Sequence, residues 1–395
     1  MEQIGKIRVL HIITRLVRGG ADENTIHNIR GLDSNIYDVD LLVGGESDLQ
    51  LLADLTDINY YVLAELKRDV NPWADFVGFF KLVNFIKRKK YSIVHTHTAK
   101  AGILGRIAGK LGGAPIIVHT LHGITFHDFM NPIVKKGYII LERITGYFTD
   151  YFITVGEDLK NKYLDQRIGR SNQYETIYSG FPIDKFIESC HVTDSIKRDE
   201  LKKLSVSSGD VFIGTVTRLE PRKGHTYLFQ AATKIVKQHP NVKFLIIGEG
   251  PYREQLEIEV RNLNLQNNVV FVGYREDVGR IISFFDIFVL TSLWEGLPRV
   301  LVQAALAEKP IVTFEVEGAW EVVKDGVNGY IVPSKNVEKL SDRLFVLLSD
   351  LEKAKTMGVQ GRKIVNNNWD VSVMVKNTSL VYERLLQMKK LNGRF

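Results

Sequence analysis

The sequence contains a single cysteine, Cys190, among its 395 residues. One cysteine cannot form an internal disulfide, and no Cys/His spacing matches a zinc site, so a reducing cytoplasm is the compartment that we expect. No apolar run reaches the roughly 18 residues that a membrane span needs. The first residues, MEQIGKIRVLHIIT, lack the basic flank and the cleavage site of a signal peptide, and they predict a buried strand instead.

Proline is also scarce, with 10 residues against 32 glycines. This balance suits an α/β protein with many tight turns between strands and helices. At roughly 100–200 residues per domain, the length predicts two domains. The formal net charge is +6, and residues 81–143 hold 11 Lys and Arg against two acids. Such a balance is compatible with nucleic acid, an anionic membrane surface or a phosphorylated ligand as partner.

Short apolar runs alternate with segments of helical periodicity, and this series occurs twice. Strands that alternate with helices form parallel sheets of βαβ units. The first series predicts strands at 6–13, 39–43, 60–63, 93–97, 115–120, 151–155 and 173–178. The second predicts strands at 211–217, 243–247, 269–272, 287–291 and 311–314. We therefore expect two Rossmann-like α/β domains, with the polar stretch Glu188–Asp210 as the linker.

Residues that follow the strands are the candidates for a site, because ligands bind beyond the carboxyl ends of open parallel sheets. Arg218 and Lys223 stand at a strand end and a helix start, where two cations could clamp a phosphate. A solvated basic loop is the alternative interpretation.

Glu295 follows another strand of the second series and could accept hydrogen bonds from sugar hydroxyls. Gln303 lies two helical turns later on roughly the same side. The N–H groups of Gly296 and Leu297 could hold a diphosphate. The alternative is a carboxylate that only caps the helix.

Other strand ends carry weaker signals. Gly19 and Gly20 open a helix, where the backbone could approach a phosphate or could simply turn. His122 could point into a cleft, although a structural histidine is the more common case. Gly248 belongs to a Gly-x-Gly turn, and no Gly-x-Gly-x-x-Gly is present, so a dinucleotide fingerprint is not supported.

Two further patterns predict no site. His95 is interpreted as structural and His97 as cleft-adjacent at most. Asp38 and Asp40 form an Asp-x-Asp, but this motif begins a strand at its amino end, away from the expected cleft. No other Asp/Glu/His cluster has metal spacing, so we expect no metal.

The segment 294–312, WEGLPRVLVQAALAEKPIV, resembles the signature of the retaining glycosyltransferases of family 4, which have the GT-B fold. In that signature a Glu is followed, after seven residues, by a second Glu. Glu295 matches the first, whereas Gln303 replaces the second. Further similar blocks extend the resemblance from about residue 8 to residue 333: Gly19–Ala21, His95–Arg106, His119–Gly123, Arg218–Gly224 and Gly318–Pro333.

The resemblance implies two domains that face each other across a cleft. Residues 188–372 would hold the nucleotide-sugar donor. There Arg218 and Lys223 would neutralise the leaving diphosphate, and Glu295 would bind hydroxyls of the transferred sugar. Gln303 would take the place of the ribose-binding carboxylate, and Tyr274 would border the base.

The N-terminal residues 1–187, to which about 373–395 would cross back, form the acceptor domain that the resemblance implies. Gly19 and Gly20 would approach the phosphates from this side. His122 would contact the sugar near its C6 hydroxyl.

The reaction implied is retaining, metal-independent transfer of a hexose or N-acetylhexosamine from a nucleotide-sugar to a hydroxyl acceptor. UDP is the expected nucleotide, cell-envelope polysaccharide the expected product, and neither a cofactor nor a nucleic-acid partner is expected. A nucleotide-sugar epimerase of the same fold and a non-catalytic nucleotide- or carbohydrate-binding protein remain as alternatives.

The segment Trp73–Lys90 is apolar at helix length and ends in four cations. One interpretation is an interfacial helix on an anionic membrane, supported by the basic region 81–143, which would make the protein peripheral on the inner face of the cell membrane. The other is an ordinary helix that covers the sheet.

Overall fold

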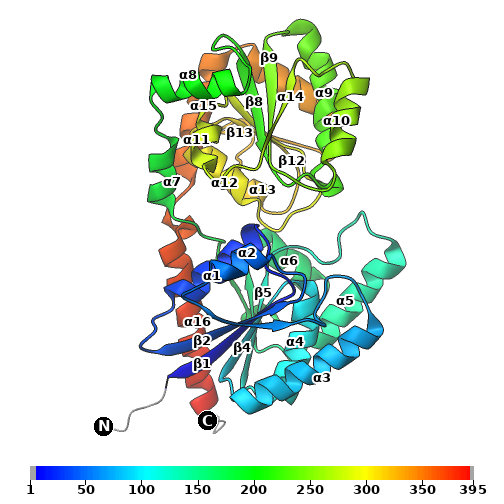
Figure 1. Cartoon of the computed structure of the whole chain (residues 1–395), viewed down its shortest axis with the longest axis vertical. Helices are drawn as coiled ribbons and strands as arrows, with labels where there is room; N and C mark the ends of the chain where they lie inside the picture. The colour runs from blue at the N-terminus through cyan, green and yellow to red at the C-terminus, as the bar shows by residue number, and fades with distance from the viewer. Residues whose placement is uncertain (1–5, 392–395) are drawn as a thin grey trace. The chain divides into compact units, whose positions relative to one another are not determined.

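The computed structural model describes residues 6–391 (Figure 1). Residues 1–5 and 392–395 lie outside the described part. They belong to the N-terminal segment and to the C-terminal segment that was predicted to cross back to the N-terminal domain. The chain divides into an N-terminal unit, Met1–Phe181 with Asn368–Phe395, and a C-terminal unit, Pro182–Asn367. Each unit has its own parallel sheet and its own core, which confirms the predicted fold class.

The N-terminal unit contains a seven-stranded sheet in the order β3-β2-β1-β4-β5-β6-β7. All neighbouring strands pair in parallel. The strands are β1 (Ile7–Ile13), β2 (Tyr37–Gly44), β3 (Asn59–Leu63), β4 (Ile93–His97), β5 (Ile116–Leu121), β6 (Tyr151–Thr154) and β7 (Tyr174–Thr176). The helices are α1 (Gly20–Gly31), α2 (Leu49–Ala53), α3 (Pro72–Lys89), α4 (Ala99–Leu111), α5 (Pro132–Gly146), α6 (Glu157–Asp165) and α16 (Val371–Leu391), with a short η1 (Ser171–Gln173).

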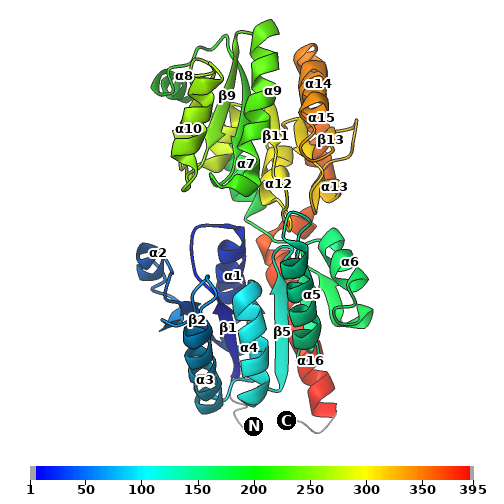
Figure 2. The same ribbon diagram turned by 90° about the vertical axis from the view of Figure 1, so that its right-hand side faces the viewer.

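Alternate residues of β1 enter different cores, because successive side chains of a strand point to opposite faces. Leu10 packs with residues of α3 and α4, and Figure 2 shows α3, α4 and α5 next to one another. Val9 packs on the other face with Tyr382 and other residues of α16. The predicted return of the C-terminal segment is therefore confirmed, and α16 completes the core of the N-terminal unit.

The C-terminal unit contains a six-stranded sheet in the order β10-β9-β8-β11-β12-β13. The strands are β8 (Val211–Val216), β9 (Val242–Ile247), β10 (Val269–Gly273), β11 (Ile287–Leu290), β12 (Ile311–Phe314) and β13 (Gly329–Val332). The helices are α7 (Ile183–Cys190), α8 (Asp194–Lys203), α9 (His225–Gln238), α10 (Arg253–Asn262), α11 (Val278–Ser283), α12 (Arg299–Leu306), α13 (Ala319–Val322), α14 (Val337–Leu348) and α15 (Leu351–Ile364), with short η2 (Pro221–Lys223) and η3 (Asn367–Trp369).

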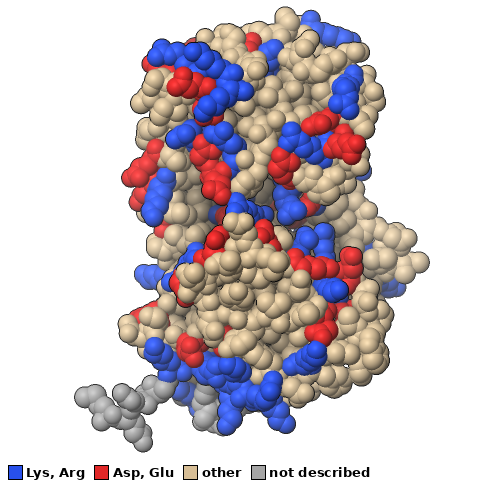
Figure 3. Space-filling model, viewed as in Figure 1, with Lys and Arg blue, Asp and Glu red and all other residues tan. Residues whose placement is uncertain are grey.

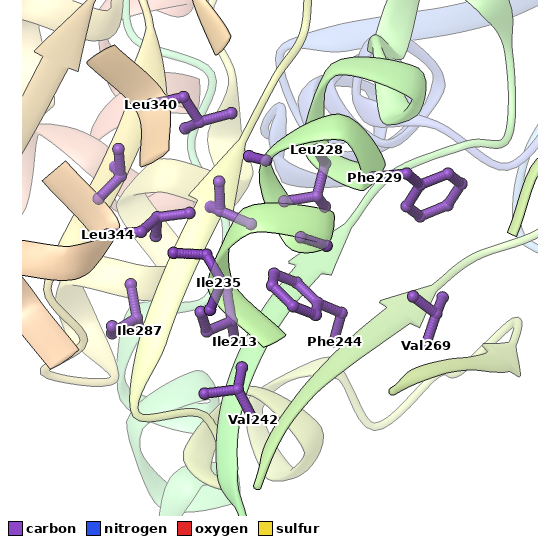
Figure 4. Packing of buried hydrophobic residues seen from close by; sticks show 14 of the residues in the cluster. Ile213, Leu228, Phe229, Ile235, Val242, Phe244, Val269, Ile287, Leu340 and Leu344 are labelled. Atoms are coloured by element: carbon purple, nitrogen blue, oxygen red, sulfur yellow. The ribbon is translucent and has the colours of Figure 1, made fainter. Parts of the chain in front are cut away.

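The core of this unit lies between the sheet and the helices α9 and α14. Figure 4 shows Leu228 and Ile235 from α9 and Leu340 and Leu344 from α14 near Ile213 of β8. These side chains are at most 1% exposed. The strands read as continuous apolar runs because helices cover both faces of the sheet.

The prediction that Glu188–Asp210 is the linker between the domains is wrong. This stretch holds the end of α7 and the whole of α8, and α7 packs on α11 inside the C-terminal unit. The chain crosses between the units at Phe181–Pro182 and returns at Asn367–Asn368. The helix α8 is short and polar, and Glu200 and Leu201 are its buried residues. Such a helix leaves little apolar periodicity in the sequence.

Candidate functional site

The carboxyl ends of β8 and β11 bring a lysine and a glutamate together. Lys223, at the end of η2, places its Nζ 2.5 Å from Oε1 of Glu295 in the loop after β11. Both side chains are only 11% exposed. These two residues were predicted as parts of one site, and the strand order places β8 and β11 side by side, which accounts for their contact.

Further charges extend this pair into an alternating chain. Arg222 lies with Nη1 3.5 Å from Oε2 of Glu295 and with Nε 3.0 Å from Oε2 of Glu220. Arg218 pairs with the other oxygen of Glu220 at 3.0 Å. Three cations and two carboxylates therefore line the ends of two adjacent strands, so the cluster carries an excess of one positive charge. This arrangement can attract and hold an anion.

Arg222 and Glu220 were not singled out from the sequence. The available signal was the density of charged residues at 218, 220, 222 and 223, directly after the strand. The charged cluster that contains Arg218 and Lys223 therefore has more members than the sequence indicated.

The pKa values of the pair follow from burial and from mutual attraction. Burial raises the pKa of Glu295, but Lys223 and Arg222 outweigh this effect and hold its pKa below the usual range. Burial lowers the pKa of Lys223, and Glu295 opposes this change. The Glu295 carboxylate is therefore ionised at neutral pH and held as a fixed hydrogen-bond acceptor.

The backbone of the two loops is also in close contact. Gly224 has φ +64°, and a Cβ at this position would lie 2.1 Å from the carbonyl oxygen of Thr291. The Thr291 hydroxyl donates to the Lys223 carbonyl at 3.1 Å, and the Leu293 N–H donates to the Arg222 carbonyl at 2.8 Å. Only glycine permits this approach, which fixes the lysine relative to the glutamate.

The loop after β12 supports the other side of Glu295. Glu317 accepts a hydrogen bond from the backbone N–H of Glu295 at 3.1 Å. Leu297 is buried, and a Cβ at Gly318 would lie 2.7 Å from its Cδ1 and 3.2 Å from the carbonyl oxygen of Gly296. Glu317 was not predicted as a site residue, although the acidic, glycine-containing turn is visible in the sequence.

The remaining donor candidates also belong to the C-terminal unit. Gln303 is half-buried on α12, which begins at Arg299 after the loop that carries Glu295. Gly248 follows β9, and a Cβ there would lie 1.9 Å from the carbonyl oxygen of Thr217, so its place in the backbone already requires glycine. Tyr274 follows β10 and is half-exposed.

The glycine loop of the N-terminal unit leads into α1 as predicted. Gly19 is the N-cap of α1 and Gly20 its first residue. Asp22 and Glu23 occupy the first turn. Burial raises the pKa of Asp22 to about 7, well above the usual value of an aspartate. A phosphate at this helix start would meet two acidic side chains, which makes the loop a weaker anion site than the cluster after β8.

His122 follows β5 and is half-buried. Its Nε2 lies 2.9 Å from Nδ1 of His97, the last residue of β4. His97, which was expected to be adjacent to a cleft at most, has a fully buried side chain. It touches the predicted site residue directly, together with His11, which the sequence did not single out.

Three histidines of the described residues 6–391, His11, His95 and His97, lie close enough to hold a metal ion. Hydrogen bonds already engage both ring nitrogens of each: His11 with His97 and Tyr382, His95 with Tyr382 and Thr120, and His97 with His11 and His122. A metal would have to break these bonds. The group is better described as a hydrogen-bonded network.

Asp38 and Asp40, which were rejected as a metal site, take part in side-chain contacts at the start of β2. Asp40 is buried and accepts a hydrogen bond from the hydroxyl of Tyr91. Arg8 contacts both carboxylates, Asp38 at 3.3 Å and Asp40 at 3.5 Å. These contacts give the motif a structural role.

The basic region 81–143 is partly neutralised inside the unit. Arg106 is fully buried and pairs with fully buried Glu142 at 2.7 Å, joining α4 to α5. Lys100 pairs with Asp75 at 2.6 Å. Glu142 is already counted among the acids of this region, so of these two pairs only that of Lys100 with Asp75, which lies outside residues 81–143, lowers its net positive charge.

Two family models match the chain, one on each half. Residues 18–185 match the model described as Glycosyltransferase Family 4, and residues 196–364 match the model described as Glycosyl transferases group 1. Together they include the strand-end residues of both units that the sequence singled out.

The chain is also similar to proteins of known or assigned activity. It is 26% identical over 382 residues to UDP-Gal:alpha-D-GlcNAc-diphosphoundecaprenol alpha-1,3-galactosyltransferase of Escherichia coli, with 95% of this chain and 97% of the relative covered. It is 26% identical to the capsular polysaccharide biosynthesis glycosyltransferase CapM of Staphylococcus aureus, with 82% and 84% covered.

Among solved structures, HepE of Anabaena in complex with UDP-glucose has a TM-score of 0.80 to this chain. The two share 22% sequence identity, and the alignment covers 96% of this chain and 100% of HepE. This likeness supports the fold assigned from the two sheets. With both halves matched by their family models, the chain belongs to the GT-B glycosyltransferases, with a family 4 N-terminal half and a group 1 C-terminal half.

Proposed function

We propose that this glycosyltransferase moves a hexose or N-acetylhexosamine from a UDP-sugar to a hydroxyl acceptor during synthesis of a cell-envelope polysaccharide. The cluster of Arg218, Arg222, Lys223 and Glu295 at the ends of β8 and β11 carries this proposal. The E. coli relative is named for a UDP-sugar donor and a lipid-diphosphate acceptor, and HepE was solved with UDP-glucose.

In the donor site, Arg218 and Lys223 neutralise the diphosphate. Its negative charge increases as the bond to the sugar breaks. Arg222 adds a third cation and keeps Glu295 ionised. Glu295 accepts hydrogen bonds from sugar hydroxyls. Gln303 contacts the ribose as an amide, and Tyr274 borders the base, as the resemblance implies.

The transfer is proposed to be retaining and metal-independent. The bond between the anomeric carbon and the diphosphate oxygen breaks, and the acceptor hydroxyl attacks from the same face. Its proton passes to an oxygen of the departing diphosphate, so charge and atoms balance. Glu295 is held by Lys223 and Arg222, which suits a hydroxyl-binding role better than nucleophilic attack on the sugar.

The N-terminal unit is proposed to bind the acceptor and to supply His122 near the C6 hydroxyl of the sugar. Gly19 and Gly20 add backbone contacts near the phosphates. The proposed domain roles follow the two units, with residues 182–367 as the donor domain.

Calorimetric titration with UDP-, GDP- and ADP-sugars tests the donor assignment. We expect binding of a UDP-sugar, and release of UDP when an acceptor is present. Glu295→Ala should lower turnover by at least about 100-fold, because it removes the acceptor group for sugar hydroxyls and leaves Lys223 unpaired. Absence of binding to all three classes would contradict the proposal, and interconversion of sugars without UDP release would identify an epimerase instead.

We also propose that the N-terminal unit contacts an anionic membrane surface through α5. Ile133, Ile140, Ile144 and Tyr147 recur at helical spacing along α5 and its C-cap, and all four are exposed, Ile133 to 82% and Tyr147 to 88%. An exposed apolar stripe of this length on a helix is typical of a surface that inserts into the interface of a bilayer.

Cations lie near this stripe. Arg143, Arg167 and Arg170 surround a surface pocket beside Tyr147, where lipid phosphates would find complementary charge. The helix α3 is the one that the sequence predicts as a possible interfacial helix. Its Leu82 and Ile86 enter the core. Its Trp73, Phe76 and Phe80 are exposed. Figure 3 shows further Lys and Arg gathered at the lower end of this unit, where the last turn of α3 carries Lys87, Arg88 and Lys89.

Among residues 6–391, no helix combines the length and the hydropathy needed to cross a membrane.

A further inference from the structure

A continuous line of hydrogen bonds runs through the N-terminal unit from its interior to His122. Nε2 of His122 is 2.9 Å from Nδ1 of His97, and Nε2 of His97 is 2.9 Å from Nδ1 of His11. Nε2 of His11 is 3.3 Å from the hydroxyl of Tyr382. The same hydroxyl is 2.5 Å from Nδ1 of His95.

The last link joins Nε2 of His95 to Oγ1 of Thr120 at 2.6 Å. His11, His95, His97, Thr120 and Tyr382 are at most 3% exposed, so water does not compete for these bonds. We call this series of six side chains, Thr120, His95, Tyr382, His11, His97 and His122, the histidine chain.

The register of three strands explains why these side chains meet. His11 of β1 lies opposite His95 of β4, and His97 of β4 lies opposite Thr120 of β5. All four point to one face of the sheet, the face that α16 covers with Tyr382, because residues two apart on a strand share a face. Tyr382 reaches them from a helix 371 residues further along the chain than His11.

The buried rings are neutral, so all hydrogen bonds of the histidine chain must run in the same direction. Burial and the neighbouring histidines lower the pKa of His95 and of His97 well below the usual value, and burial lowers the pKa of His11 to about 3. A neutral imidazole donates from one nitrogen and accepts at the other. Tyr382 has one O–H, so it donates to one histidine and accepts from the other.

When His122 is also neutral, only two consistent arrangements of protons exist. In one, every donor points toward His122, whose Nε2 accepts and whose proton sits on Nδ1. In the other, every donor points toward Thr120, and the proton of His122 sits on Nε2. Changing the tautomer of His122 requires the four imidazoles and the tyrosine hydroxyl to change together, so the interior of the unit controls that tautomer.

We propose that the histidine chain holds His122 in one tautomer and one orientation, and that Tyr382 on the C-terminal helix is a positioning residue for this site. The value of this arrangement for transfer rests on the proposed function, in which His122 contacts the sugar. A ring fixed in one tautomer and one orientation presents one defined hydrogen-bonding atom to the sugar.

The network itself can be tested without any substrate, by NMR of the whole chain labelled with nitrogen-15 in its 10 histidines. We expect couplings between the nitrogens of His97 and His122 and between those of His11 and His97, transmitted through the N–H···N hydrogen bonds. The spectrum of His122→Asn assigns the His122 signals. Absence of both couplings in the unaltered protein would overturn the proposal.

Tyr382→Phe removes one hydroxyl and cuts the histidine chain at its middle. We expect the His122 nitrogen signals to change from one tautomer to an average of two. Tyr174→Phe is the matched control, because Tyr174 is also buried in this unit and its hydroxyl donates to the Ile168 carbonyl outside the histidine chain. Identical His122 signals in Tyr382→Phe and in the unaltered protein would refute the positioning role. If Tyr382→Phe does not fold, the couplings in the unaltered protein decide the matter.

Turnover of a UDP-sugar separates this proposal from the proposed function. We expect Tyr382→Phe to lower kcat by roughly 10-fold and to leave the donor KM within about twofold, because the ring of His122 stays present but is no longer held. Changed His122 signals in a protein that turns over no UDP-sugar, even unaltered, would support the histidine chain while contradicting the proposed function.

Discussion

Nζ of Lys223 lies 2.5 Å from Oε1 of Glu295, although 72 residues separate them in the sequence. The cation that is proposed to hold the diphosphate is thus already paired with the carboxylate that is proposed to hold the sugar. Each keeps the other charged in a buried place. The diphosphate and the sugar hydroxyls of the donor would then bind to a pair of side chains that is already ordered.

Loss of this lysine should disable donor binding. Lys223→Met removes a charge-assisted contact to the diphosphate and leaves Glu295 buried beside Arg222 alone, so we expect kcat/KM for the UDP-sugar to fall by at least about 100-fold. Lys309→Met is the control, since Lys309 is also partly buried, lies just before β12 and donates to the carbonyl of Ser283 at the end of α11. Equal losses of donor affinity in the two variants would show that the loss follows from removal of any buried lysine and not from the position of Lys223 in the donor site.

The close approach of the two loops predicts an unusual sensitivity at Gly224. Gly224→Ala adds a Cβ 2.1 Å from the Thr291 oxygen at a residue with φ +64°, so we expect a loss of at least about 3 kcal/mol in unfolding free energy and loss of donor binding. Gly326→Ala provides the comparison, because Gly326 has φ +75° but no atom lies within 4 Å of the place that its added Cβ would take. We expect that variant to cost only about 1 kcal/mol. Urea denaturation measures both, and similar costs would argue against the close contact.

Gln303, which replaces the second glutamate of the family signature, should weaken nucleotide binding without abolishing activity. Gln303→Glu restores a carboxylate that can accept a charge-assisted bond from the ribose, so we expect UDP to bind more tightly by about 1 kcal/mol. Isothermal titration with UDP measures the difference. A variant that binds UDP much more weakly than the unaltered chain would show that the ribose contact is organised differently here.

The buried histidines predict that stability decreases in mild acid. Burial lowers the pKa of His11 to about 3, that of His225 to about 4, and those of His95, His97 and His119 well below the usual value. Below about pH 6.5 the unfolded chain binds protons that the folded chain does not, so unfolding free energy falls by roughly 1.4 kcal/mol per pH unit for each such histidine.

Asp22, with its raised pKa of about 7, acts in the opposite direction but contributes a single proton. Urea denaturation at about pH 7.5 and at about pH 5.5, on either side of the usual histidine pKa, measures the sum. We expect clearly lower stability at the acidic pH, and equal values at the two pH values would mean that these histidines are protonated in the folded protein.

The apolar stripe of α5 predicts binding to vesicles that contain anionic phospholipid. Exchange of Ile140 and Ile144 for serine should weaken binding roughly 30-fold, since burial of two partly exposed isoleucines contributes about 2 kcal/mol. Ile258→Ser on α10 is the control, because Ile258 is comparably exposed in the C-terminal unit. Sedimentation at low and high salt separates the apolar from the electrostatic part. A chain that stays in the supernatant at low salt would remove the membrane proposal.

Local pattern was enough to predict the fold class and most strands. Apolar runs bounded by glycine and polar turns report buried parallel strands directly, so the predicted strand at 287–291 and the observed Ile287–Leu290 nearly coincide. The same logic singled out Lys223 and Glu295 as candidates, because ligands bind beyond the carboxyl ends of parallel strands. Short polar helices such as α8 were missed, since they bury too few residues to leave a period.

What local pattern could not supply was which distant residues meet. The pairing of Lys223 with Glu295 depends on β8 lying beside β11, and the contact of Tyr382 with His11 depends on α16 covering the face to which the odd-numbered residues of β1 point. Strand order, register and the return of the C-terminal helix are properties of the whole packed unit. The residues that could do chemistry can therefore be picked out from the sequence. Their partners and charge states were decided by packing, because burial and contact between remote segments exist only in the folded chain.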